Sequence, residues 1–104
     1  MTMTKTEPTI VIFRKWKESS GEGIIALFPE LPADNDGFYC DSYEHVGQHG
    51  AADYSGLMRT TVPAKPSECL NLATELRRIG YKLVVRHRVS PAMNEKRRKL
   101  ARQT

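Results

Sequence analysis

The sequence lacks the features that mark membrane, secreted and common nucleotide-binding proteins. None of its apolar runs approaches the ~18–20 residues of a membrane-spanning helix, and residues 1–8 are polar, without the apolar stretch of a secretory signal. It contains no G-x-S-x-G, P-loop or G-x-G-x-x-G motif. We therefore expect a cytoplasmic chain with no membrane partner and no cofactor, and we favour a role other than catalysis.

Cysteine is scarce as well. Cys40 and Cys69 lie far apart and form no C-x-x-C motif. Without a secretory signal we expect both to be reduced thiols. Each has apolar neighbours in the sequence, so we expect small, buried apolar side chains.

Positive charge is absent from the middle of the chain. Between Glu18 and Met58 there are eight acidic residues and no lysine or arginine, and the net charge of +4 resides in residues 91–104. A composition of 39% hydrophobic and 27% charged residues is typical of one globular domain. We therefore divide the chain into a flexible leader (1–8), a single domain (9–90) and a mobile basic C-terminal tail (91–104) with too little apolar surface to dock.

Five segments have the composition or alternation of strands, and one has the periodicity of a helix. The expected strands are 9–17, 24–28, 38–46, 56–62 and 81–89, with a glycine-bearing loop at 47–55. The expected helix is 66–79, since Pro66 suits the first position, apolar residues recur at helical spacing and Gly80 ends it. We predict an α+β fold with a two-layer, mainly antiparallel sheet of about five strands (β-β-β-β-α-β), one packed helix, and 56–62 parallel to 81–89.

The predicted core takes one face of each element. Its members are Ile10, Ile12, Ile25, Leu27, Cys40, Leu57, Leu72, Leu76, Ile79, Leu83 and Val85. On the same face of the last strand we expect His87 as a partly buried ring, with a pH switch as the alternative.

Side chains that could bind a ligand or a metal are most concentrated in residues 42–54. Tyr43, His45, Gln48, His49 and Asp53 are the candidates for a binding loop, and His45, His49 and Asp53 could converge as metal ligands. Gly47 and Gly50 argue against the helix that would put both histidines on one face, and hydrogen bonds that shape a glycine-rich turn are the commoner role for so loose a cluster. A Cys40–His45 or Ser42–His45 pair is disfavoured because the partners have opposite parity on a strand.

A second set of candidates is basic. Lys82, Arg86 and Arg88 share one face of the last expected strand, and the tail adds Lys96, Arg97, Arg98 and Lys99. Such residues can follow nucleic-acid phosphates. They are also the usual covering of a solvent-facing sheet or of a solvated tail.

Residues 42–53 have the pattern S-Y-x-H-V-G-Q-H-G-x-A-D, followed by the runs P-A-K-P-S-E and L-R-R-I-G-Y-K-L-V-V-R-H-R. Over residues 9–88 the chain resembles a group of small conserved bacterial proteins, some from plasmids and mobile elements, for which no activity is established. The resemblance implies a bacterial, cytoplasmic setting and assigns no site residues.

Two functions are consistent with these features. The first is a small non-catalytic binding or adaptor module, a monomer or small homo-oligomer, whose partner is a protein or a nucleic acid. The second is a metal- or small-molecule-binding protein, conceivably an enzyme, centred on His45, His49 and Asp53.

Overall fold

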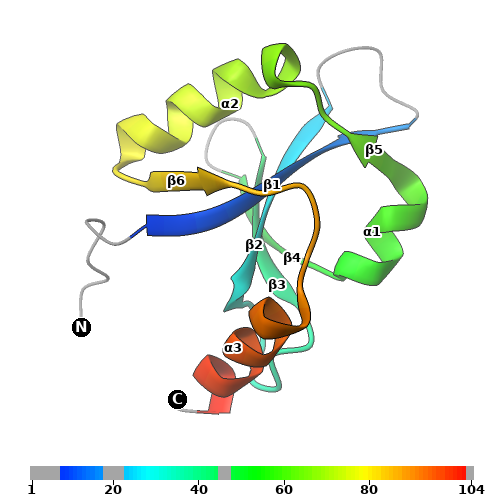
Figure 1. The fold of residues 1–104 in the computed structure, drawn as a ribbon, viewed down its shortest axis with the longest axis vertical. Coiled ribbons are helices and arrows are strands. Elements are labelled where there is room, and N and C mark those ends of the chain that lie inside the picture. Colours follow the sequence, from blue (N-terminus) through cyan, green and yellow to red (C-terminus); the bar gives the residue numbers. More distant parts are fainter. Residues whose placement is uncertain (1–7, 18–22, 45–47, 103–104) are drawn as a thin grey trace.

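The computed structural model describes residues 8–17, 23–44 and 48–102, with only the backbone for Gln48 and His49 (Figure 1). In chain order its elements are β1 (Pro8–Trp16), β2 (Ile24–Pro32), β3 (Cys40–Glu44), β4 (Gln48–Ala52), α1 (Tyr54–Thr60), β5 (Thr61–Pro63), α2 (Pro66–Ile79), β6 (Lys82–Val85) and α3 (Pro91–Arg102). No helix in this described part has the length and apolar character needed to cross a membrane.

The six strands form one sheet around β1. Its main path runs β4-β3-β2-β1-β5, with antiparallel pairing at each step. The edge of β1 away from β2 is shared by two short strands: β6 pairs with Pro8–Val11 in parallel, and β5 pairs with Arg14–Trp16. The α+β class, the mainly antiparallel sheet and the packed helix at 66–79 are confirmed.

Four details of the predicted order are wrong. The expected loop at 47–55 contains strand β4, and the expected strand at 56–62 is helix α1 followed by β5. Tyr54, Leu57 and Met58 explain the helix, because they have i, i+3, i+4 spacing and all pack against one apolar cluster of the sheet. The strand expected at 81–89 ends at Val85, and its parallel partner is β1 rather than the segment before α2.

The central strands are buried on both faces, which one-sided alternation did not predict. On one face Val11, Phe13 and Phe28 pack with Leu72 and Leu76 of α2. On the other face the buried cluster, with α1 and Val89 against it, comprises Ile12, Ile25, Leu27, Cys40 and Ala52. The core therefore contains both parities of β1 and β2, as in sheets covered by helices on each side.

Several core predictions are confirmed and two are wrong. Ile12, Ile25, Leu27, Cys40, Leu72 and Leu76 are buried, whereas Ile10, Leu57 and Leu83 are half-buried. Ile79 and Val85 are 39% and 41% exposed. Both lie at the end of an element, where the partner element no longer covers them.

Residues 91–102 form helix α3, which packs on the C-terminal end of β2, so the prediction that they have too little apolar surface to dock is wrong. Met93 and Ala101 are buried, and Arg97 between them is only 4% exposed. Arg97 donates from Nε to the carbonyl oxygen of Gly37 (2.8 Å) and from Nη1 to that of Pro29 (2.8 Å). A hydrogen-bonded cation therefore takes the place of the missing apolar residues.

Candidate functional site

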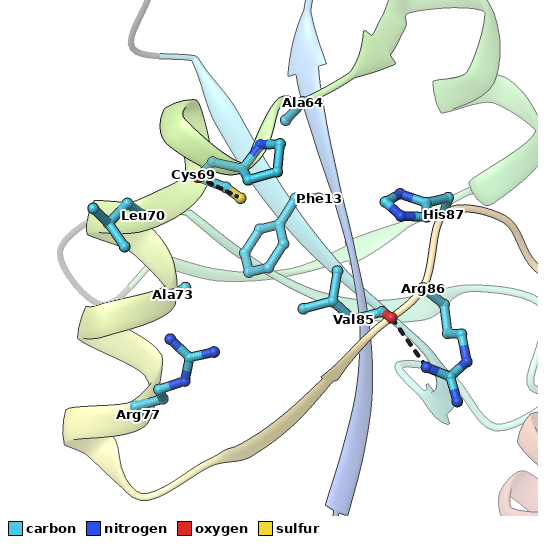
Figure 2. A pocket seen from close by; sticks show the side chains of 10 residues that line it. Phe13, Ala64, Cys69, Leu70, Ala73, Arg77, Val85, Arg86 and His87 are labelled. Atoms are coloured by element: carbon cyan, nitrogen blue, oxygen red, sulfur yellow. Dashed lines mark hydrogen bonds between the residues drawn. The ribbon is translucent and has the colours of Figure 1, made fainter.

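A cavity of about 360 Å³ lies between α2 and the segment that follows β6 (Figure 2). Phe13 of β1 lies in the middle of it, with Cys69 and Ala73 of α2 on one side and Val85 and His87 on the other. Phe13 itself is 6% exposed and belongs to the core cluster under α2. The cavity therefore has an apolar, partly aromatic floor that is continuous with the core.

The sheet topology explains why the cavity exists. In their pairing with β1, β5 ends at Pro63 opposite Arg14, and β6 ends at Val85 opposite Val11. The carboxyl ends of the two short strands therefore point towards each other along the same edge of β1, near its middle. Beyond the ladders, the Ala64 amide donates to the carbonyl oxygen of Phe13 (3.3 Å) and the Arg86 amide to that of Val11 (2.9 Å). The chain then leaves the sheet on both sides, and Phe13 lies in the gap.

Basic residue types lie on both sides of this gap. Arg77 of α2, Arg86 and His87 line the cavity, and all three are exposed. His87 is thus not the partly buried core ring that alternation predicted, because the strand ends at Val85 and parity no longer fixes its direction. No acidic residue of the described part of the chain lines the cavity. The site therefore combines an apolar floor with a positively charged rim.

The exposed cations continue beyond the cavity. We define the α2–β6 basic surface as Arg77, Arg78, Lys82, Arg86 and Arg88, which are all exposed. None of the five forms an ion pair with a carboxylate of the described residues, whereas Lys15 pairs with Glu68 (2.5 Å) and Lys96 with Glu30 (3.1 Å). Of these residues Lys82 lies in β6, whereas Arg86 and Arg88 lie in the segment after it, so the prediction that one strand face carries Lys82, Arg86 and Arg88 is wrong.

The two cysteines are free and occupy different environments. Cys40 is buried under the opposite face of the sheet, and burial raises the pKa of its thiol to about 11, although the positive charge of Arg97 opposes the shift. Cys69 lines the cavity, where its Sγ lies 3.5 Å from the carbonyl oxygen of Pro66, and partial burial raises its pKa. Both thiols are therefore protonated and poorly nucleophilic near neutral pH.

Strands β3 and β4 pair as an antiparallel hairpin, and its described residues keep the predicted binding-loop candidates apart. The ring of Tyr43 is 1% exposed in the core below α2, and its hydroxyl donates a hydrogen bond to Glu75 Oε2. Tyr43 is thus part of the packing between the hairpin and α2 rather than of a surface loop. His49 pairs with Tyr43 in the ladder between β3 and β4, and Gln48 pairs with Glu44.

Asp53 lies on the other side, where β4 ends and α1 begins. It lines a second hollow, of about 390 Å³, together with Glu44 and Trp16, whose Nε1 donates to Glu44 Oε1 (3.2 Å). His45 lies outside the described residues. Within the described part of the chain no three potential metal ligands lie together, and the metal site at His45, His49 and Asp53 stays a prediction.

The basic residues of α3 divide into three kinds. Lys96 pairs with Glu30, and Arg97 is buried, so Arg97 is not available to a partner. Arg98 and Lys99 are exposed. The four candidates from this segment therefore do not form one continuous phosphate-binding stretch.

The apolar part of the cavity was missed at the level of the sequence. Phe13 of β1, Ala64 between β5 and α2, and Cys69 of α2 are distant in the sequence, and they come together with Val85 only when β5 and β6 pair with β1. A signal was nevertheless present, because Arg77, Arg86 and His87 lie in the run 76–88, where basic residues are interspersed with apolar ones. No protein-family model, no curated protein and no solved structure matches this chain.

Proposed function

We propose that this chain is a non-catalytic binding module whose partner is a nucleic acid, held through its phosphates by the α2–β6 basic surface. The observation that carries the proposal is the set of five exposed cations that pair with no carboxylate of the described residues. Phosphate groups are the natural counterions of such a surface, and their neutralisation supplies most of non-specific nucleic-acid affinity.

The distribution of charge favours one direction of approach. The acidic stretch 18–58 contains no lysine or arginine, and its described carboxylates Glu44 and Asp53 line the hollow beside α1 and not the cavity. An acid-rich region and a base-rich region on one small domain orient a polyanion during diffusional encounter.

The absence of a complete catalytic set among the described residues supports a binding role. Cys40 and Cys69 are protonated thiols, and Ser42 is buried at 4% exposure. The free thiols fit the reducing cytoplasm, and with the resemblance of residues 42–53 they support a bacterial, cytoplasmic setting. We propose a monomer or small homo-oligomer, because binding through this surface needs no second copy.

Binding of a fluorescently labelled single-stranded oligonucleotide, followed by anisotropy over a range of salt concentrations, tests the proposal. We expect affinity to fall as salt rises, and Lys82→Ala and Arg88→Ala each to make the slope of log K against log salt shallower by about 0.7. Arg59→Ala, which removes an exposed arginine of α1, is the matched control and should leave the slope unchanged. Equal slopes in all four proteins, or no binding at low salt, would contradict the proposal.

A further inference from the structure

We infer that the cavity between α2 and β6 holds one unstacked base of a single-stranded nucleic acid, while the α2–β6 basic surface holds the phosphates on either side of it. This inference rests on the proposed function and names the form of nucleic acid that the site takes. It follows from the shape of the cavity, the chemistry of its wall and the position of the cations.

The size of the cavity fits one nucleotide better than a longer segment. Its volume of about 360 Å³ is near the lower end of the ~300–1,000 Å³ range of ligand pockets. Because the bases of a duplex are stacked and paired, a single base reaches such a cavity only from a single strand or from a flipped position.

The wall has the two components that a base requires. Phe13 supplies an aromatic ring in the floor, and Ala64, Ala73 and Val85 add apolar surface around it. An aromatic ring stacks on any base because every base has a π-face. An acidic peptide would find the cations here, but it would leave this apolar floor uncovered.

Two arginines and a histidine lie where phosphates adjoining a bound base would be. Arg77 comes from α2 on one side of the cavity, and Arg86 and His87 come from the opposite side (Figure 2). Arg78, Lys82 and Arg88 are exposed and do not line the cavity. A free nucleotide would occupy the rim alone, so the cations beyond the cavity favour a strand that continues past the bound base.

A comparison of an intact single-stranded oligonucleotide with an abasic oligonucleotide of the same length tests this inference on the unaltered protein. Both carry the same phosphates, and only one carries bases. We expect the intact strand to bind about tenfold more tightly, a value typical of stacking by one base. Equal affinities would overturn the inference and leave the proposed function standing, whereas no binding by either strand would overturn both. Tighter binding of a poly-glutamate peptide of equal charge would also overturn both.

Two variants locate the effect in the cavity. Ala64→Leu fills the cavity without changing charge and should reduce the affinity for the intact strand to that for the abasic strand. Lys82→Ala should lower the affinity for the intact and the abasic oligonucleotide by the same factor. A preference for the intact strand that persists in Ala64→Leu protein, shown by its circular dichroism to be folded, would overturn the inference.

Cys69 gives an independent readout, because it lines the cavity while Cys40 is buried. We expect the intact strand to slow carboxamidomethylation of Cys69 by iodoacetamide, a neutral reagent, by several-fold, and the abasic strand at equal saturation to leave the rate nearly unchanged. Equal protection by both strands would place the bases outside the cavity and overturn the inference.

Discussion

Helices α2 and α3 are both amphipathic and both contain adjacent arginines, yet they are anchored by opposite means. α2 buries the apolar stripe of Leu72, Ala73 and Leu76 against the sheet. α3 buries Arg97, whose guanidinium satisfies the carbonyl oxygens of Pro29 and Gly37. Basic residues are thus exposed at the end of one helix and buried as packing on the other, and sequence composition does not distinguish the two.

The carbonyl groups explain the difference. The pairing of β2 with β3 shifts register between Phe28 and Pro32, so the carbonyl of Pro29 at this irregularity needs a donor from outside the ladder. Gly37 belongs to the following loop and has a positive φ of 71°. A buried C=O without a donor is costly, and Arg97 supplies donors to both groups.

The largest effect should come from the apolar anchor. Leu76 is completely buried, and Leu76→Ala should lower the free energy of unfolding by about 2–5 kcal/mol through lost burial and a residual cavity. Chemical denaturation measures this, with exposed Thr74→Ala as the control on the same helix. A loss below about 0.5 kcal/mol would mean that α2 is not anchored by this stripe.

The polar anchor should be nearly as strong. Arg97→Met keeps much of the side-chain volume but removes the donors to Pro29 and Gly37, so we expect a loss of about 3 kcal/mol in unfolding free energy. Arg98→Met is the matched control, since Arg98 is exposed, and should change stability by less than about 0.5 kcal/mol. Similar values for both variants would show that α3 does not depend on the buried guanidinium.

The two cysteines should make different contributions to the pH dependence of stability. Because burial raises the pKa of Cys40 from 9.0 to about 11, the folded state keeps a proton that the unfolded state releases above pH 9. Its contribution to stability is complete below pH 9 and is lost as pH rises towards 11, by a few kcal/mol at most, on the order of 1.4 kcal/mol for each unit by which the pKa is raised. Unfolding free energies of the wild type and Cys40→Ala should therefore converge over this range.

Cys69, less buried on α2, provides the comparison for this prediction. Burial also raises its pKa. The unfolding free energies of the wild type and Cys69→Ala should therefore also converge as pH rises, but by less than those of the wild type and Cys40→Ala. Stability curves of Cys40→Ala and the wild type that run parallel from pH 8 to pH 11 would contradict the prediction.

The smallest effect should lie where α2 meets the hairpin. Tyr43→Phe removes the hydroxyl that donates to Glu75 and should lower the unfolding free energy by about 1 kcal/mol. Tyr39→Phe, at an exposed tyrosine, serves as the control. Because Tyr43 lies in the core, oligonucleotide affinity should remain that of the wild type, and a loss of affinity without a loss of stability would return Tyr43 to the functional surface.

Local patterns predicted the elements whose partners matter least. Helix α2 has its start, stripe and stop within residues 66–80, and the antiparallel pairing of β1 with β2 follows from two strands that are adjacent in the chain. Helix α1 was missed because its three packing residues, Tyr54, Leu57 and Met58, occupy a short segment with no strong cap. Asp53 makes no side-chain hydrogen bond at its N-terminus.

The features that the sequence did not predict depend on pairing between distant segments. The position of β6 beside β1, and therefore the cavity over Phe13, depends on contacts between the two ends of the described domain. The exposure of Lys82, Arg86 and Arg88 could be predicted because charged side chains stay in solvent in almost any fold. The apolar floor of the cavity forms only after the strands have paired. The docking of α3 depends on two backbone carbonyls, which leave no trace in a pattern of side chains.

The shared edge of β1 also has a kinetic consequence. Pro8 pairs with Lys82 at one end of β1, and Trp16 pairs with Thr61 at the other, so both pairings close long loops but that of β6 closes the longer one. Loop closure of this kind slows folding relative to local hairpins and helices. We expect the β1–β2 hairpin to form early and β6 to join last, which makes the cavity over Phe13 one of the final features to appear during refolding.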